Sequence, residues 1–198
     1  VFIKNDWGQG INDVFVARFK ELGGEVVYDE GVTVDTKDMR TVVTKLKAAN
    51  PETIFAPIYP NNAVALLKQL SEFGIKLPII GGDAFVDPVI WKIAGAEGVL
   101  YVQAKTNLSE DFQNRVKTVT GKDANTFTPF FYDAVKILAK AIENAKSTDG
   151  KAIQDALSKI SYKESVAVPI VEFDNNGDLK YADFQVFVIK NKKGVLLP

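Results

Sequence analysis

The chain has 198 residues, of which 46% are hydrophobic and 25% are charged, and its formal net charge is −1. Balanced charge argues against a nucleic-acid-binding protein, which would show a basic face. No apolar run approaches the roughly 20 residues that a membrane span needs. Cysteine and histidine are both absent, which excludes disulfides and thiolate metal sites and removes the commonest general base and transition-metal ligand.

From Val1 to Gln103 the sequence alternates between apolar runs and helical patterns. Strands are expected at 1–3, 25–28, 53–58, 77–80 and 99–103, and helices at 12–22, 37–49 and 61–73. A short helix should follow the capping residue Asp87 and Pro88. Leu66, Leu67 and Leu70 are expected to be core residues. Strands that alternate with helices through short loops predict an α/β fold with a doubly wound parallel sheet.

The pattern changes after Gln103. Helices are expected at 109–119 (capped by Ser109), 130–145 and 151–160, and strands at 166–173 and 182–190 with a turn at 174–178. Helices without parallel strands between them indicate a second structural unit. The helix at 130–145 carries much apolar surface, and no sheet in this chain is evident to cover it.

Three turns carry the residues that best suit a binding site. They are Trp7-Gly8-Gln9-Gly10, Ile58-Tyr59-Pro60-Asn61 and Gly81-Gly82-Asp83-Ala84-Phe85, each after an expected strand and before an expected helix. The carboxyl ends of parallel strands are the edge where such folds bind ligands. We therefore expect Trp7, Tyr59 and Asp83 to meet at one rim and to hold a small molecule with a cationic group and an apolar part.

Each of these residues also has a structural interpretation. Trp7 and Tyr59 are alternatively aromatic packing at the rim, and Asp83 is alternatively a capping or loop-bracing carboxylate. Because Asp83 follows two glycines, a ligand would be able to approach the backbone closely there.

Other motifs give little support to catalysis or metal binding. Gly8-Gln9-Gly10 lacks the third glycine of a dinucleotide-binding turn, and no Walker-type motif is present. Asp174 to Asp178 resembles the start of a calcium loop, but Gln185 stands near where a bidentate glutamate is expected, so a hairpin turn explains the same residues. No histidine activates a serine, and nothing selects a catalytic pair of carboxylates. We therefore expect no enzyme, no metal and no cofactor.

Several blocks, in order, resemble the periplasmic type I solute-binding proteins of branched-chain amino-acid ABC transporters. The blocks are Asn5-Asp6-Trp7-Gly8-Gln9-Gly10, Leu46-Lys47-Ala48-Ala49-Asn50-Pro51, Tyr59-Pro60-Asn61, Gly81-Gly82-Asp83, Ile93-Ala94-Gly95-Ala96-Glu97-Gly98, Tyr132-Asp133-Ala134-Val135 and Phe173-Asp174-Asn175-Asn176-Gly177-Asp178. Those proteins have two lobes that close on a ligand.

The resemblance implies a domain register. Residues 1–105 and 184–198 would form the second lobe, and 106–183 the C-terminal part of the first lobe, whose remainder would be absent. The start at Val1, already strand-like, favours a processed or truncated chain. By this register Trp7 and Tyr59 match pocket aromatics, Phe127 matches an aromatic of the first lobe, and Asp83 matches an acid for the ligand ammonium. Donors for the ligand carboxylate would lie in the absent segment.

The resemblance further implies a function. The protein would capture a small amino acid, with the branched-chain type favoured, by hinged closure and deliver it to a membrane permease without a cofactor. It would work in the periplasm or outside the cell, with a lipid anchor as one option. The alternatives are a sensor or receptor domain of the same fold and a small α/β hydrolase or nucleotide-binding enzyme.

Overall fold

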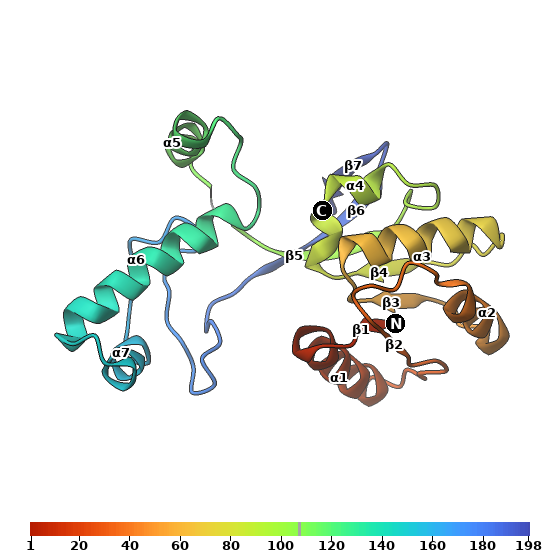
Figure 1. Cartoon of the computed structure of the whole chain (residues 1–198), viewed down its shortest axis with the longest axis horizontal. Coiled ribbons are helices and arrows are strands. Elements are labelled where there is room, and N and C mark those ends of the chain that lie inside the picture. Colours follow the sequence, from red (N-terminus) through yellow and green to blue (C-terminus); the bar gives the residue numbers. More distant parts are fainter. Residues whose placement is uncertain (107) are drawn as a thin grey trace. The chain divides into compact units, whose positions relative to one another are not determined.

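The computed structural model describes residues 1–106 and 108–198, and the chain divides into two units. The first unit consists of Val1–Gln103 together with Gln185–Pro198, and the second of Ala104–Phe184 (Figure 1). Asn107, inside the predicted segment 106–183, lies outside the described residues.

The first unit holds most of the strands. In chain order its elements are β1 (Phe2–Ile3), α1 (Asp6–Glu21), β2 (Gly31–Val32), α2 (Arg40–Ala49), β3 (Ile54–Ala56), α3 (Pro60–Glu72), β4 (Ile79–Gly81), the 3-10 helix η1 (Asp83–Val86), α4 (Pro88–Trp91), β5 (Leu100–Ala104), β6 (Phe184–Lys190) and β7 (Lys193–Leu196). The last residue of β5 and the first residue of β6 belong to the second unit.

Parallel pairing dominates the sheet. β1 pairs with β2, β3 with β4, and β4 with β5, all in parallel, whereas β6 and β7 form an antiparallel hairpin beside β5. Backbone hydrogen bonds join β1 to the β3 segment, from Ile3 N to Pro57 O at 3.1 Å and from Val1 N to Phe55 O at 3.0 Å. The strands therefore lie in the order β2-β1-β3-β4-β5-β6-β7, and the expected α/β fold class is confirmed.

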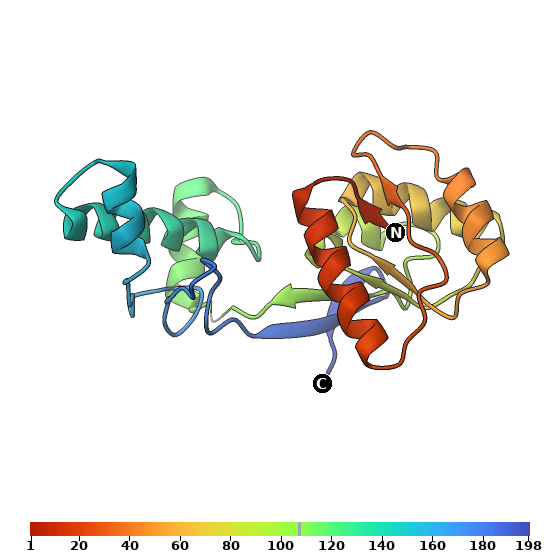
Figure 2. The same cartoon turned by 90° about the horizontal axis from the view of Figure 1, so that it is seen from below.

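Helices cover both faces of this sheet. The chain moves outward from β1 to β2 and then returns past β1 to β3, so right-handed crossovers place α1 and the next helices on opposite faces. Figure 1 shows α1 on one side of β3 and β4 and α3 on the other, and Figure 2 shows the same unit from below. Leu66, Leu67 and Leu70 of α3 are at most 3% exposed, as expected of core residues.

Two predicted strands are wrong. Residues 25–28 form no strand, and the second strand is β2 at Gly31–Val32. Residues 166–173 also form none: only the isolated bridges from Tyr162 to Val171 and from Phe173 to Leu179 occur there. The hairpin strand β7 was not predicted.

The start of α1 also differs from prediction. The helix begins at Asp6 because the Asn5 side chain caps it, accepting a hydrogen bond from Gly8 N at 2.9 Å. Trp7-Gly8-Gln9-Gly10 is therefore helical from its first residue and is not the turn that its glycines indicate.

The second unit is built on helices. They are α5 (Glu110–Thr120), α6 (Thr128–Ala145) and α7 (Gly150–Leu157). Ser109 caps α5 as expected, accepting a hydrogen bond from Phe112 N at 3.2 Å. One face of α6 contributes Ile137 to a small core with Ile160, Ala167, Val168 and Val171.

The segment Asp174 to Asp178 is a hairpin turn. The Asp174 carboxylate accepts hydrogen bonds from Asn176 N at 2.8 Å and Asp178 N at 2.9 Å, and Gly177 has a positive φ of 88°. Phe173 and Leu179 pair across it. The hairpin interpretation is thus confirmed.

Candidate functional site

The carboxyl ends of β1 and β3 form a switch point in the sheet. From β1 the chain crosses to β2, whereas from β3 it crosses in the other direction to β4. The loops therefore diverge between these strands, and such a switch point is the usual ligand position in open α/β sheets. Trp7 lies in the first turn of α1, just after β1, and Tyr59 lies between β3 and α3.

Trp7 and Tyr59 contact each other at this switch point. Their rings are stacked, with centroids 5.2 Å apart and planes inclined by 10°. The Asn5 side chain holds the arrangement, because its Nδ2 donates to the Tyr59 hydroxyl at 2.9 Å while its Oδ1 caps α1. Both rings are partly exposed, so they offer apolar surface at the rim.

Asn5 was not among the predicted site residues. Its signal was an asparagine directly after a strand-like run, a preferred cap position. The two glycines that follow masked this signal, because they placed the expected start of the helix at 12.

Asp83 is the first residue of η1 and follows β4. Its carboxyl is partly buried, and desolvation raises its pKa above the ordinary value, while hydrogen bonds from the backbone N–H groups of Ala84 and of Asp83 itself act in the opposite direction. Among the described residues no ion pair involves Asp83. A desolvated carboxylate without a cation is suited to receive one from a ligand.

The two glycines before Asp83 have different roles. A Cβ on Gly81 would lie 2.3 Å from the Phe85 ring, which is fully buried, so this glycine serves internal packing. A Cβ on Gly82 would lie 3.7 Å from Pro57 Cα and 4.0 Å from Trp7 Cη2, which is ordinary contact. The residue before Asp83 therefore lies beside the Trp7 ring, so the segments that hold Trp7, Tyr59 and Gly82 come together within the first unit.

Phe127 belongs to the second unit, Ala104–Phe184. It precedes α6, is 38% exposed, and donates its N–H to the Asn125 side chain at 3.0 Å.

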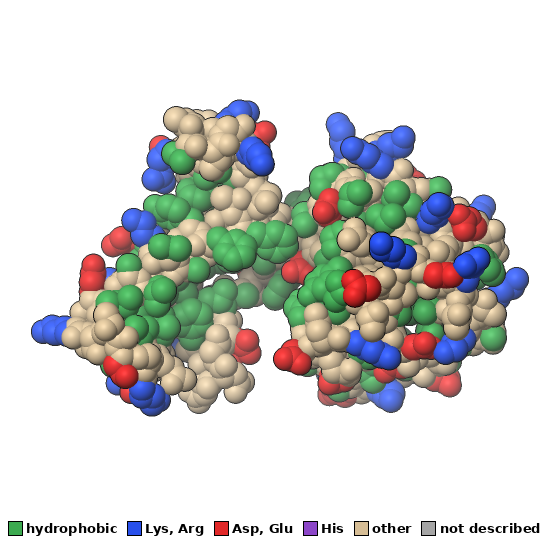
Figure 3. Space-filling model, in the orientation of Figure 1, with side chains coloured by type: hydrophobic (Ala, Val, Ile, Leu, Met, Phe, Trp, Pro, Cys, Tyr) green, Lys and Arg blue, Asp and Glu red, His purple; other side chains and the backbone are tan. Residues whose placement is uncertain are grey.

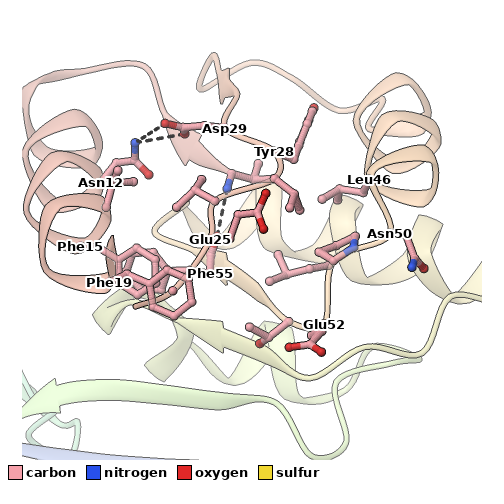
Figure 4. Close-up of a pocket in the computed structure, with 18 of the residues that line it drawn as sticks. Asn12, Phe15, Phe19, Glu25, Tyr28, Asp29, Leu46, Asn50, Glu52 and Phe55 are labelled. Atoms are coloured by element: carbon pink, nitrogen blue, oxygen red, sulfur yellow. Dashed lines mark hydrogen bonds between the residues drawn. The ribbon is translucent and has the colours of Figure 1, made fainter. Parts of the chain in front are cut away.

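The two described cavities lie elsewhere. One, of about 480 Å³, is bounded by α1, residues 23–29 and residues 50–55 (Figure 4). The other, of about 580 Å³, lies between the end of α3 and residues 95–99. Neither is lined by Trp7, Tyr59, Asp83 or Phe127. In the described part of the chain no cluster of acidic side chains could hold a metal ion, and no helix is long and apolar enough to span a membrane.

The approach of α1 to β1 depends on Gly8. A Cβ there would lie 2.3 Å from Ile3 O and 2.9 Å from Ile3 N, both backbone atoms, whereas a Cβ on Gly10 meets nothing within 4 Å. Gly8→Ala should lower the free energy of unfolding by about 1–3 kcal/mol, and Gly10→Ala should raise it by about 0.5–1 kcal/mol. Urea denaturation of both variants checks this, and equal effects would contradict the close packing.

Residues 3–194 match the model of the Periplasmic binding protein family. The chain belongs to this family, and the resemblance seen in its sequence blocks is confirmed.

Two curated relatives carry the names of amino-acid-binding proteins. The chain is 29% identical to the Leu/Ile/Val-binding protein homolog 3 of Brucella melitensis, covering 93% of this chain and 51% of that protein. It is 27% identical to the leucine-, isoleucine-, valine-, threonine-, and alanine-binding protein of Pseudomonas aeruginosa, covering 93% and 50%. The chain thus spans about half the length of the curated relatives it matches.

Solved structures of similar proteins share the fold. The leucine binding protein LivK of Thermotoga maritima superposes with a TM-score of 0.81 at 25% identity, covering 98% of this chain and 57% of that one. The substrate binding protein LivJ of Streptococcus pneumoniae, solved in complex with isoleucine, gives a TM-score of 0.74 at 24% identity, covering 98% and 57%.

Proposed function

We propose that the chain is part of an extracytoplasmic solute-binding protein that captures a small amino acid, of the branched-chain type, for an ABC transporter. The observation that carries the proposal is the Trp7–Tyr59 stack at the switch point of the sheet, with Gly82, the residue before Asp83, beside the Trp7 ring. The names of the relatives support the same ligand class.

The chemistry of the rim fits a zwitterion with an apolar side chain. The stacked rings supply apolar contact area, and the partly desolvated Asp83 carboxylate attracts an α-ammonium group. Binding of this kind changes no covalent bond, so the proposed role is capture and not catalysis.

The proposal assigns a lobe to each unit. The unit of Val1–Gln103 and Gln185–Pro198 is one lobe, and Ala104–Phe184 is part of the other, to which Phe127 belongs. Closure of two lobes about the strands that connect them would enclose the ligand, and the closed form would dock on a membrane permease. Periplasmic or extracellular location follows from the family.

Calorimetry on a binding protein of full family length that carries this chain tests the proposal. Leucine, isoleucine and valine are expected to bind, and glucose and adenosine monophosphate are not. Asp83→Asn should weaken leucine binding at least about thirtyfold, because removing one charge of a desolvated pair costs about 2–5 kcal/mol. Asp13→Asn is the matched control, since Asp13 is an exposed carboxylate on α1.

Two outcomes would separate the parts of the proposal. Unchanged leucine affinity in Asp83→Asn would reject the role of Asp83 alone. Binding of sugars or nucleotides without any amino acid would reject the proposed function.

A further inference from the structure

The cavity of about 580 Å³ lies at the end of the sheet opposite to the candidate site. Its lining comes from residues 67–74 at the end of α3, residues 75–79 that lead into β4, and residues 95–99 that lead into β5. β4 and β5 are parallel and both begin here, whereas Tyr59 and Asp83 follow the carboxyl ends of strands. Small-molecule sites usually have volumes of about 300–1,000 Å³, so this cavity is large enough for a ligand.

The walls of the cavity are apolar. Four of the lining side chains are at most 6% exposed and belong to the core of the first unit, and two more are partly buried against that core. The four are Leu67, Leu70, Ile79 and Val99, and the two are Ile75 and Leu77. A molecule that enters the cavity is therefore favoured when it offers apolar surface.

Glycines determine where the cavity is open. A Cβ on Gly74 or on Gly98 would meet nothing within 4 Å, so the space beside both residues is unfilled. Gly95 differs, because a Cβ there would lie 3.1 Å from Leu67 O and 3.6 Å from Ser71 Cβ. The segment 95–99 thus comes close to α3 at Gly95, and the cavity stays open beside Gly74 and Gly98.

Hydrogen bonds hold both loops, so the cavity is formed before any ligand binds. Ile75 N donates to Leu70 O of α3 at 2.9 Å, which fixes the segment that leads into β4. Gly98 N donates to Ile189 O of β6 at 2.8 Å, which fixes the segment that leads into β5. A preformed site loses little free energy to ordering when it binds a ligand.

The polar groups of the lining favour an anion. Lys76 and Glu97 are the charged residues of the described lining. Both Glu97 oxygens accept from Asn191 N, at 3.0 and 3.3 Å, so this carboxylate is engaged in holding the β6–β7 turn. Lys76 takes part in no ion pair of the described part of the chain. The backbone N–H of Leu77 has no hydrogen bond there either, so donors without a protein acceptor border the apolar walls.

We propose that this cavity binds a free monocarboxylate with an apolar alkyl chain. The chain covers the wall of Leu70, Ile79 and Val99, and the carboxylate stays at the open side, where it pairs with the Lys76 ammonium. A neutral apolar molecule would leave that ammonium without an acceptor, and an alkylammonium would place a second cation beside it. The site shares no residue with the candidate amino-acid site, so it does not depend on the proposed function.

Titration of the whole chain with octanoate, followed in its proton–nitrogen correlation spectrum, tests the proposal. The amides of Gly74, Gly95 and Gly98 lie in the lining, and their resonances should shift and saturate. Hexanoate, shorter by two methylenes, should bind about fifteenfold more weakly than octanoate. Octylammonium should bind at least about fivefold more weakly, because its charge is repelled by Lys76 instead of paired with it.

Two variants locate the ligand. Ser71→Phe places a ring in the cavity beside Gly95 and should weaken octanoate binding at least about tenfold. Glu72→Phe is its control, since Glu72 is the next exposed residue of α3 and lies outside the lining. Lys76→Gln should weaken binding about twofold to fivefold, the range of a surface ion pair. Lys68→Gln, also exposed on α3 and outside the lining, should leave the affinity unchanged.

The readout at single amides separates this site from other apolar surfaces of the chain. Octanoate shifts confined to amides outside the lining would overturn the proposal, and so would octylammonium binding as tight as that of octanoate. An affinity for octanoate that is unchanged in both Ser71→Phe and Lys76→Gln would overturn it as well.

Discussion

Asp133→Ala is expected to destabilise the unit Ala104–Phe184 severely. The Asp133 side chain is 3% exposed and accepts hydrogen bonds from Ser165 Oγ at 2.6 Å, Val166 N at 3.1 Å and Ala167 N at 3.0 Å. Alanine would deprive these buried and partly buried donors of the carboxylate and leave Ala167 N only its contact with Ser165 Oγ at 3.2 Å. Each buried group that loses its acceptor costs about 1–3 kcal/mol. We expect the free energy of unfolding of this unit to fall by about 3–5 kcal/mol.

Denaturant unfolding combined with hydrogen exchange at Val166 and Ala167 measures this effect. Asp155→Ala on α7 is the matched control, because its exposed carboxylate pairs with Lys151 at 2.9 Å, and surface pairs contribute about 0–1 kcal/mol. Equal destabilisation by the two variants would show that Asp133 does not anchor the segment 165–167.

The second large effect concerns self-association through α6. Phe131 is 74% exposed, Val135 70% and Leu138 46%, and their spacing places them on one helix face. Figure 3 shows hydrophobic side chains gathered over this helix. Covering an apolar side chain is worth about 1.5–3 kcal/mol, so this face favours self-association of the chain.

Replacing both Phe131 and Val135 with lysine should weaken that association at least about hundredfold, since two buried side chains are lost and like charges are added. Sedimentation velocity over a range of concentrations measures the change. Val119→Lys on α5 is the control, because Val119 is 85% exposed and an isolated apolar residue needs no partner. A wild-type chain that stays monomeric at every concentration would refute the prediction.

Local signals predicted most of the helices and the caps Asp87 and Ser109, but not the start of α1 at Asp6 or its cap Asn5. Val42, Val43 and Leu46 recur at helical spacing and are buried in α2, and the Asp87 side chain caps α4 as its position before Pro88 indicates. These features depend on neighbours a few residues away, so the sequence displays them directly.

Long-range pairing was less predictable. Exposed and partly buried residues do alternate from 25 to 28, as in a strand. A strand also needs a hydrogen-bonding partner along its whole length, and local sequence does not show how far that partner extends. The β6–β7 hairpin turns through Asn191 and Lys192, both with positive φ (52° and 58°). Such turns usually carry glycine, and its absence here hid the strand that follows.

The candidate site divides in the same way. The positions of Trp7, Tyr59 and Asp83 after strands could be predicted from apolar runs and turn residues. The stacking of Trp7 on Tyr59 could not, because residues far apart in sequence meet only through the strand order. Close approach of a ligand was expected at Gly81 and Gly82, whereas the space beside Gly81 is taken by the Phe85 ring.

The dual role of Asn5 has a consequence for the entropy of binding. The same side chain fixes the start of α1 and the Tyr59 hydroxyl. Turning Tyr59 away would leave Asn5 Nδ2 and the Tyr59 hydroxyl without their shared hydrogen bond. The aromatic wall formed by Trp7 and Tyr59 is therefore restrained before any ligand arrives. A wall ordered in advance loses little rotamer freedom on contact, and more of the interaction energy with a ligand is then available as affinity.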